Sequence, residues 1–233
     1  MALQPDILNE PCDLIAHWIN GDQGTAVSQV DPVGQWNFDT GASAANNDFA
    51  RRTRATGITP PNQFTIEFKV KCENLGTKAN QDFLRFWWQT ATWKFVVAIC
   101  SDGLYITKVG NVITEVGTDI VKCNGGAAWQ IFRFQVDKSA GESLAVVETF
   151  LEGVSQGTVD CDYETSQPDK ICNIYLHGYA TDNIHCHIDY IKIATGLGEI
   201  GNYEGPAMTK DYLEYHRGRN RFRTRGVSLG IDK

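Results

Sequence analysis

The chain has 233 residues, of which 42% are hydrophobic and 11% aromatic, and its formal net charge is −7. This composition is typical of a folded globular protein, so it excludes wholesale disorder, and the negative charge argues against a surface that binds nucleic acid generally. The first 18 residues, MALQPDILNEPCDLIAHW, lack a basic segment followed by an apolar one, and no later apolar run is long enough to cross a bilayer. We therefore expect no secretory signal and no membrane partner.

Strands are predicted almost throughout residues 25–195. Residues 63–72, QFTIEFKVKC, alternate apolar and polar side chains over their whole length, which indicates one strand with a single apolar face. Residues 92–110, TWKFVVAICSDGLYITKVG, contain an Asp-Gly pair between two apolar runs, which predicts a β-hairpin. Residues 111–121, NVITEVGTDIV, continue as short strands interrupted at glycine.

The rest of this region repeats the pattern. In residues 129–161 the turn sequences KSAGES and EGVSQG separate the predicted strands, and HCHIDYIKIAT, residues 185–195, is the last strand. Turns recur at the intervals found in β-sandwiches, and no segment keeps a helical period of apolar residues. One β-sandwich with short terminal extensions is the simplest architecture.

The closing segment also raises the question of a metal site. If it is a regular strand, His185, His187 and Asp189 lie on one face, and two histidines with a carboxylate form a suitable ligand set. Ile191 and Ile193 would share that face, however, which is typical of a mixed strand face and not of a dedicated site. We therefore expect no metal and no cofactor.

The seven cysteines include no CxxC pair, which argues against a zinc ribbon or a thioredoxin-like motif. Their odd number leaves at least one thiol free or bonded to another chain. Cys161 and Cys172 bracket DYETSQPDKI, a turn-containing segment between two strands, so we predict a disulfide across a hairpin. The alternative is that most cysteines are small buried apolar side chains. So many cysteines without an export signal suit a protein that is made in a cytoplasm and works outside it, as virus particles do.

Three tryptophans lie close together in FLRFWWQTATW, namely Trp87, Trp88 and Trp93. Sugar rings stack on exposed aromatic side chains, so these are candidate glycan-binding residues. Trp87 and Trp88 point to opposite faces of one strand. The alternative is therefore that one packs in the core while the other covers a sheet edge or a subunit interface.

Residues 201–233 form a predicted basic arm. They hold seven basic and four acidic residues, a charge of +3, whereas the other 200 residues hold 14 basic and 24 acidic ones, a charge of −10. If the arm is extended, five alternate arginines share one face and can each bind a carboxylate or phosphate at two points, and Phe222 supplies an apolar anchor. The alternative is a solvated, disordered tail. We expect the arm to dock on another subunit and not on nucleic acid, through Arg217, Arg219, Arg221, Phe222, Arg223 and Arg225.

Three segments resemble a known superfamily: PPNQFTIEFKVKC, AWQIFRFQVDKSAGESLAVVETFLEGVSQGTV and HIDYIKIATGLG. Together they are similar to the concanavalin A-like jelly roll shared by laminin G-like domains, legume lectins and many glucanases. Glu152-Gly153 stands where that superfamily commonly has Asp-Gly. The resemblance implies an all-β jelly-roll β-sandwich over residues 14–200, preceded by an N-terminal extension, residues 1–13, and followed by the basic, largely extended arm, residues 201–233.

Glycosidases of this fold carry three carboxylates on one strand, and this chain has no such run. Glu148 and Glu152 are the nearest pair, but one is expected in a strand and the other in a turn, so we expect no enzyme activity. The combination favours a non-enzymatic structural protein of an assembly. A phage particle fits best, as a capsid decoration, collar or tail-associated subunit.

The partners and the location of the protein follow from these expectations. The partners would be other copies of the chain or other subunits of a particle, with adhesion to cell-surface glycan as an added role. The protein would be made in the host cytoplasm and located in the virion, or otherwise in the cytoplasm. A free-standing carbohydrate-binding, lectin-like module is the alternative, and a divergent glycoside hydrolase is the third interpretation.

Overall fold

The computed structural model describes residues 2–12, 18–41, 49–54, 59–74, 83–100, 104–108, 112–115, 128–162, 171–177 and 184–201. The chain divides into two units, Met1–Gly201 and Asn202–Lys233, and all described residues lie in the first. The predicted arginine stripe, Arg217–Arg225, is therefore outside the described residues. Within them, no helix is long and apolar enough to span a membrane.

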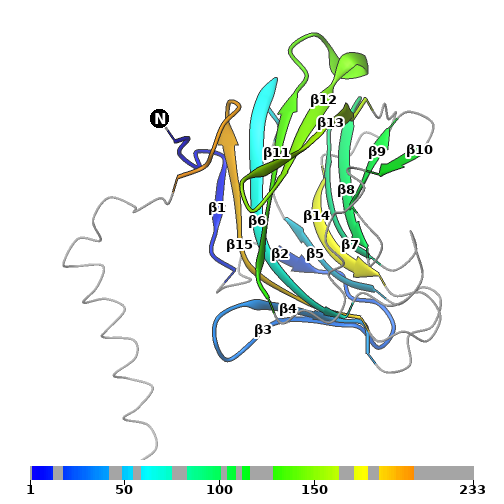
Figure 1. Ribbon diagram of the computed structural model, residues 1–233. Helices are drawn as coiled ribbons and strands as arrows, with labels where there is room; N and C mark the ends of the chain where they lie inside the picture. The colour runs from blue at the N-terminus through cyan, green and yellow to red at the C-terminus, as the bar shows by residue number, and fades with distance from the viewer. Residues whose placement is uncertain are drawn as a thin grey trace, which may run out of the picture. The chain divides into compact units, whose positions relative to one another are not determined.

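The described strands form two antiparallel sheets that pack face to face (Figure 1). The first sheet has the order β13-β12-β11-β6-β15-β4-β3, and β1 also pairs with β15. A short 3-10 helix, Glu142–Leu144, precedes β12. The strands of this sheet are β1 (Leu8–Glu10), β3 (Val27–Val30), β4 (Trp36–Asp39), β6 (Gln63–Asn74), β11 (Gln130–Asp137), β12 (Val146–Leu151), β13 (Val154–Asp160) and β15 (His185–Thr195).

The second sheet has the order β10-β9-β8-β7-β14-β5-β2. The predicted hairpin of residues 92–110 is confirmed, because β8 and β9 pair antiparallel. The strands of this sheet are β2 (Trp18–Asn20), β5 (Phe49–Arg54), β7 (Phe83–Gln89), β8 (Lys94–Cys100), β9 (Leu104–Lys108), β10 (Val112–Glu115) and β14 (Ile171–His177). The all-β jelly-roll sandwich is thus confirmed.

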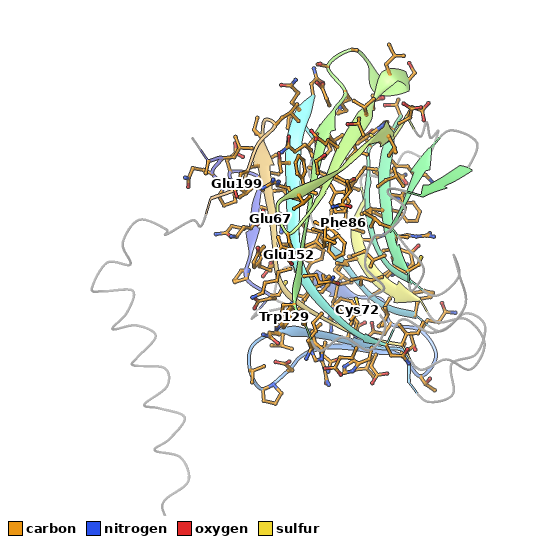
Figure 2. All side chains as sticks on the ribbon, in the orientation of Figure 1. Glu67, Cys72, Phe86, Trp129, Glu152 and Glu199 are labelled. Carbon is orange, nitrogen blue, oxygen red and sulfur yellow. The ribbon has the colours of Figure 1, made fainter. Side chains whose placement is uncertain are left out.

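The hydrophobic core lies between the sheets and follows from strand alternation. On β6, the apolar side chains of Phe64, Ile66 and Phe68 are buried, as their spacing predicts. The Phe64 ring contacts that of Trp88 on β7, with centroids 4.9 Å apart, and Phe68 contacts Phe86 at 6.2 Å. Figure 2 shows Phe86 among the side chains that fill this space. Each sheet therefore has one face turned away from this core.

The N-terminal segment is part of the sandwich, so the predicted extension of residues 1–13 was wrong. β1 pairs with β15, where Leu8 lies opposite Ile193, and Leu3 forms a parallel bridge with Ile200. Leu8 and Cys12 are buried in the core. This short segment was missed because its two core side chains carry no strand periodicity.

A β-bulge interrupts the closing strand. β15 has the predicted bounds, but its register with β6 shifts between Ile188 and Tyr190, so Asp189 is an extra residue. The extra residue reverses which side chains face inward. Ile191 and Ile193 therefore point into the core and are fully buried, and the prediction that they share a face with the histidines was wrong.

The predicted Cys161–Cys172 disulfide was also wrong. Cys161 directly follows β13 in the first sheet, whereas Cys172 lies on β14 in the second, so the two do not face each other across a hairpin. Cys161 is a free, buried thiol, and burial raises its pKa well above the usual range. All five cysteines whose side chains the structure describes are buried, as the alternative interpretation expected.

Candidate functional site

The outward side of the second sheet carries aromatic, basic and amide side chains. Alternate residues of β5, β7, β8 and β14 turn away from the core, because their neighbours, such as Leu84, Phe86 and Ile174, fill the space between the sheets. We call the outward group the Arg–Tyr face. It comprises Arg51, Arg85, Trp87, Lys94, Asn173 and Tyr175.

Tyr175 lies between two arginines on this face. It is opposite Arg51 on β5 and opposite Arg85 on β7. The Arg85 Nη1 donates a hydrogen bond to the Tyr175 Oη at 2.6 Å, and its guanidinium carbon lies 5.4 Å from the Tyr175 ring centroid. Burial raises the pKa of Tyr175, and the two guanidinium groups only partly offset this effect. The phenol is therefore neutral at neutral pH, and the charge of the arginines is not cancelled by it.

A second row lies beside the first. Asn173 is opposite Trp87 on β7. The Asn173 side chain is buried, and its Oδ1 has no hydrogen-bond partner in the part of the chain that the structure describes. The half-buried Trp87 donates from its Nε1 to the Gln89 Oε1 at 3.1 Å, and the Lys94 Nζ lies 4.8 Å from the Trp87 ring centroid. A buried acceptor without a donor calls for one from a ligand or a water.

The charge of the Arg–Tyr face contrasts with that of the chain. β5, β7, β8 and β14 contain no Asp or Glu, although the whole chain has a net charge of −7. Arg51, Arg85 and Lys94 are thus the charged side chains that these four strands contribute to the face. A guanidinium attracts anionic groups, and its planar shape can bind a carboxylate with two hydrogen bonds.

Two of the three predicted glycan-binding tryptophans are in the core, so that assignment was wrong for Trp88 and Trp93. Both have an exposed fraction of 0%. The Trp88 ring packs on Phe64, and the Trp93 indole donates to the backbone carbonyl of Cys161 at 2.9 Å. Trp87 points outward, as alternation along β7 requires. Of the three, it alone is placed to contact a ligand.

Sequence reasoning missed the arginines, Asn173 and Tyr175 as site residues. β14 lies between β5 and β7, although it follows them by more than 80 residues in the chain. No local sequence pattern predicts that β14 pairs with these two strands. A usable signal was present, however: the strands that form the face lack acidic residues in an acidic protein.

A second cluster lies on the outward side of the first sheet. The pairing of β6 with β15 shifts between His185 and Cys186, so Glu73 lies beside His185 and His187 instead of in the ladder. The Glu73 Oε2 is 3.0 Å from the His185 Nδ1, and the Glu73 Oε1 is 3.5 Å from the His187 Nε2. We call these three residues the His–Glu cluster. Asp189, the third ligand considered from sequence, instead pairs with the Lys69 Nζ at 2.7 Å.

Neighbouring groups set the charge state of the His–Glu cluster. Burial lowers the pKa of His187, and the nearby His185 and Lys71 lower it further. Lys71 also lowers the pKa of Glu73, mainly by a hydrogen bond to its carboxylate. At neutral pH the cluster therefore combines a neutral imidazole at His187 with an ionised carboxylate. Such groups are suitable ligands for a metal ion.

No protein-family model matches the chain, and neither does any curated protein. Solved structures do match. The carbohydrate recognition domain of Emp47p matches with a TM-score of 0.57 and 10% identity over 84% of this chain and 98% of that one. A seed lectin of Lotus tetragonolobus matches with a TM-score of 0.55 and 12% identity over 82% and 99% of the two chains.

An endo-β-1,4-glucuronan lyase from the fungus Trichoderma reesei is also similar, with a TM-score of 0.54 and 9% identity over 81% of this chain and 94% of that one. These similarities show the concanavalin A-like lectin and glucanase fold, and thus confirm the resemblance found in the sequence.

Proposed function

We propose that the protein is a lectin-like module that binds carbohydrate on the Arg–Tyr face, and that its ligand carries a carboxylate. The observation that carries the proposal is the position of Tyr175 between Arg51 and Arg85, beside the outward Trp87. The two guanidinium groups bind the carboxylate of an acidic sugar, and the indole stacks on the apolar side of a sugar ring.

The buried Asn173 adds selectivity. Its Oδ1 accepts a hydrogen bond from a sugar hydroxyl, and a ligand without a donor at that position leaves the acceptor buried and unsatisfied. Sites of this kind discriminate strongly against a ligand that lacks the matching group. The amide and the arginines together thus select a ligand that has both a hydroxyl and a carboxylate.

Several of the similar structures are of proteins that bind or act on carbohydrate, which supports this proposal. They include carbohydrate recognition domains, a seed lectin, a glucuronan lyase and the binding domain of botulinum neurotoxin DC in complex with SialylT. A role in a virion, and association with other copies or subunits, stay predictions. A sandwich displayed on a particle would use the same face for adhesion to a cell-surface glycan.

Titration with a soluble polyuronate tests the proposal, and the same polymer with its carboxylates reduced to alcohols serves as the matched ligand. We expect measurable binding of the polyuronate and at least about tenfold weaker binding of the reduced polymer, a difference of about 1.4 kcal/mol. Trp87→Ala and Arg85→Ala should each weaken binding, with folding checked by circular dichroism.

Trp129→Ala is the control, because Trp129 is a half-buried tryptophan directly before β11, against Lys69 of the first sheet. Its affinity for the polyuronate should equal that of the unmodified protein. The proposal fails if no acidic glycan binds, or if the Trp87 and Arg85 variants bind as well as the control. Cleavage of the polymer to an unsaturated, ultraviolet-absorbing product would instead indicate a lyase.

A further inference from the structure

We propose that the His–Glu cluster binds a divalent transition-metal ion, for which Zn²⁺ is the best match. The ligands would be the His185 Nδ1, the His187 Nε2 and a carboxylate oxygen of Glu73. The three ligand atoms lie within 4.8 Å of one another. This site is on the first sheet and is separate from the Arg–Tyr face, which is on the second.

The distances suit a small ion. Zn²⁺ binds imidazole nitrogen and carboxylate oxygen at about 2.0–2.2 Å in a tetrahedron, so two of its ligand atoms lie roughly 3.3–3.5 Å apart. The Glu73 Oε2 is 3.0 Å from the His185 Nδ1, and the Glu73 Oε1 is 3.5 Å from the His187 Nε2. Because the three ligand atoms lie within 4.8 Å of one another, side-chain rotations bring them to the separations that one ion requires. Two histidines and one carboxylate favour zinc and its neighbours over calcium or magnesium, which prefer oxygen ligands.

Neighbouring oxygen atoms favour the tautomer of both imidazole rings that this role needs. The His185 Nε2 is 2.8 Å from the Asn37 Oδ1, which only accepts, so in the neutral imidazole the proton is on the Nε2 and the Nδ1 presents a lone pair to Glu73. The His187 Nδ1 lies 3.5 Å from the Asp31 Oδ2 and has no hydrogen-bond partner among the described residues, but the nearby carboxylate favours a proton on the Nδ1 and a lone pair on the Nε2. Both lone pairs and the Glu73 carboxylate then converge, and a bound cation relieves their repulsion.

Lys71 competes with the ion. Its Nζ lies 2.7 Å from the Glu73 Oε1 and 5.9 Å from the centroid of the Trp129 ring. A cation beside the carboxylate opposes a second cation, so metal binding requires the ammonium to move away, for example onto the Trp129 ring. Replacing Lys71 by a neutral residue should therefore tighten metal binding, whereas losing a ligand should weaken it.

Calorimetric titration of the full chain with Zn²⁺, after removal of metals by a chelator, tests the site. We expect one equivalent to bind, and we expect at least about tenfold weaker binding in Glu73→Gln, His185→Gln and His187→Gln. Lys71→Met should bind more tightly than the unmodified protein. Asp189→Asn is the control, because Asp189 is a carboxylate of the same strand that pairs with Lys69, and its affinity should not change.

Co²⁺ provides a spectroscopic test that separates this site from the thiols. We expect visible bands of a tetrahedral ion with nitrogen and oxygen ligands, without the charge-transfer band of a thiolate. The proposal is overturned if no stoichiometric Zn²⁺ binds, if the three ligand variants bind like the control, or if Co²⁺ shows thiolate ligation. Absence of binding together with retained circular dichroism would show that the cluster is an ion-paired group only.

Discussion

Two adjacent tryptophans of β7, Trp87 and Trp88, lie on opposite faces of the second sheet. Trp88 is fully buried against Phe64 in the core, while its neighbour Trp87 belongs to the outward face of the second sheet. Sequence alternation predicts that the two point in opposite directions, but not which one faces the core. That choice depends on which side of β7 the other sheet covers.

Paired substitutions at these two positions separate stability from binding. Trp88→Ala should lower the free energy of unfolding by about 3–5 kcal/mol, because it leaves a large cavity. Trp87→Ala should cost less than about 1 kcal/mol of stability while it weakens polyuronate binding. Denaturant unfolding and titration of each variant give the two quantities. Equal stability losses in the two variants would contradict the assignment of Trp87 to the outward face.

At the scale of elements, regular strands could be predicted and irregular ones could not. The alternation of β6, the β8–β9 hairpin and the bounds of β15 all agree with the sequence. The bulge at Asp189 has no local signature, because it depends on the register with β6. If β15 were regular, Ile191 would share a face with His185. That wrong expectation was the argument against a metal site in the sequence.

Glu73 was not predicted as a metal ligand for the same reason, since its position depends on strand pairing. Glu73 is far from His185 in the chain, and only the pairing of β6 with β15, with its register shift, brings them together. The Arg–Tyr face likewise depends on β14 lying between β5 and β7. Local sequence patterns therefore give the strands and the alternation of their side chains. Sites assembled from several strands need the order of the sheet.

β1 was not predicted from the sequence, and a substitution at Leu8 tests its contribution to stability. Leu8→Ala should lower the free energy of unfolding by about 2–3 kcal/mol, because Leu8 is buried in the core opposite β15. Val33→Ala is the control, since Val33 is 77% exposed, and its effect should stay within about 0.5 kcal/mol. Thermal or denaturant unfolding measures both. If Leu8→Ala lowers the free energy of unfolding no more than Val33→Ala does, residues 1–13 would be an extension outside the sandwich, as the sequence predicted.

For the whole molecule, the sandwich closes within the first unit. Gly201, the last described residue, donates a backbone hydrogen bond to the Leu3 carbonyl at 2.9 Å. Both sheets and both candidate sites are therefore built from residues up to that point. The strands that the structure describes all end by Thr195, so we predict that docking of the arm, residues 201–233, to another subunit is separable from folding.

Truncation after Gly201 tests this separation. The truncated protein should keep the melting temperature of the full chain, within about 2 °C, and its affinity for the polyuronate and for Zn²⁺. If the arm docks on a particle or on another copy, only that association should be lost, which sedimentation of the two forms will show. An unfolded truncated protein would mean that the arm is required by the sandwich.

The bridge between Leu3 and Ile200 places the two ends of the first unit together, as the N-terminus and the end of β15 also show in Figure 1. β1 and β15 run antiparallel, so a force that pulls these two ends apart acts on the same end of the pair. Their hydrogen bonds would then break one after another, as in a zipper, and not all together under shear. The sandwich should thus open at low force when pulled through both ends. Anchored at one end alone, it transmits no load through β1.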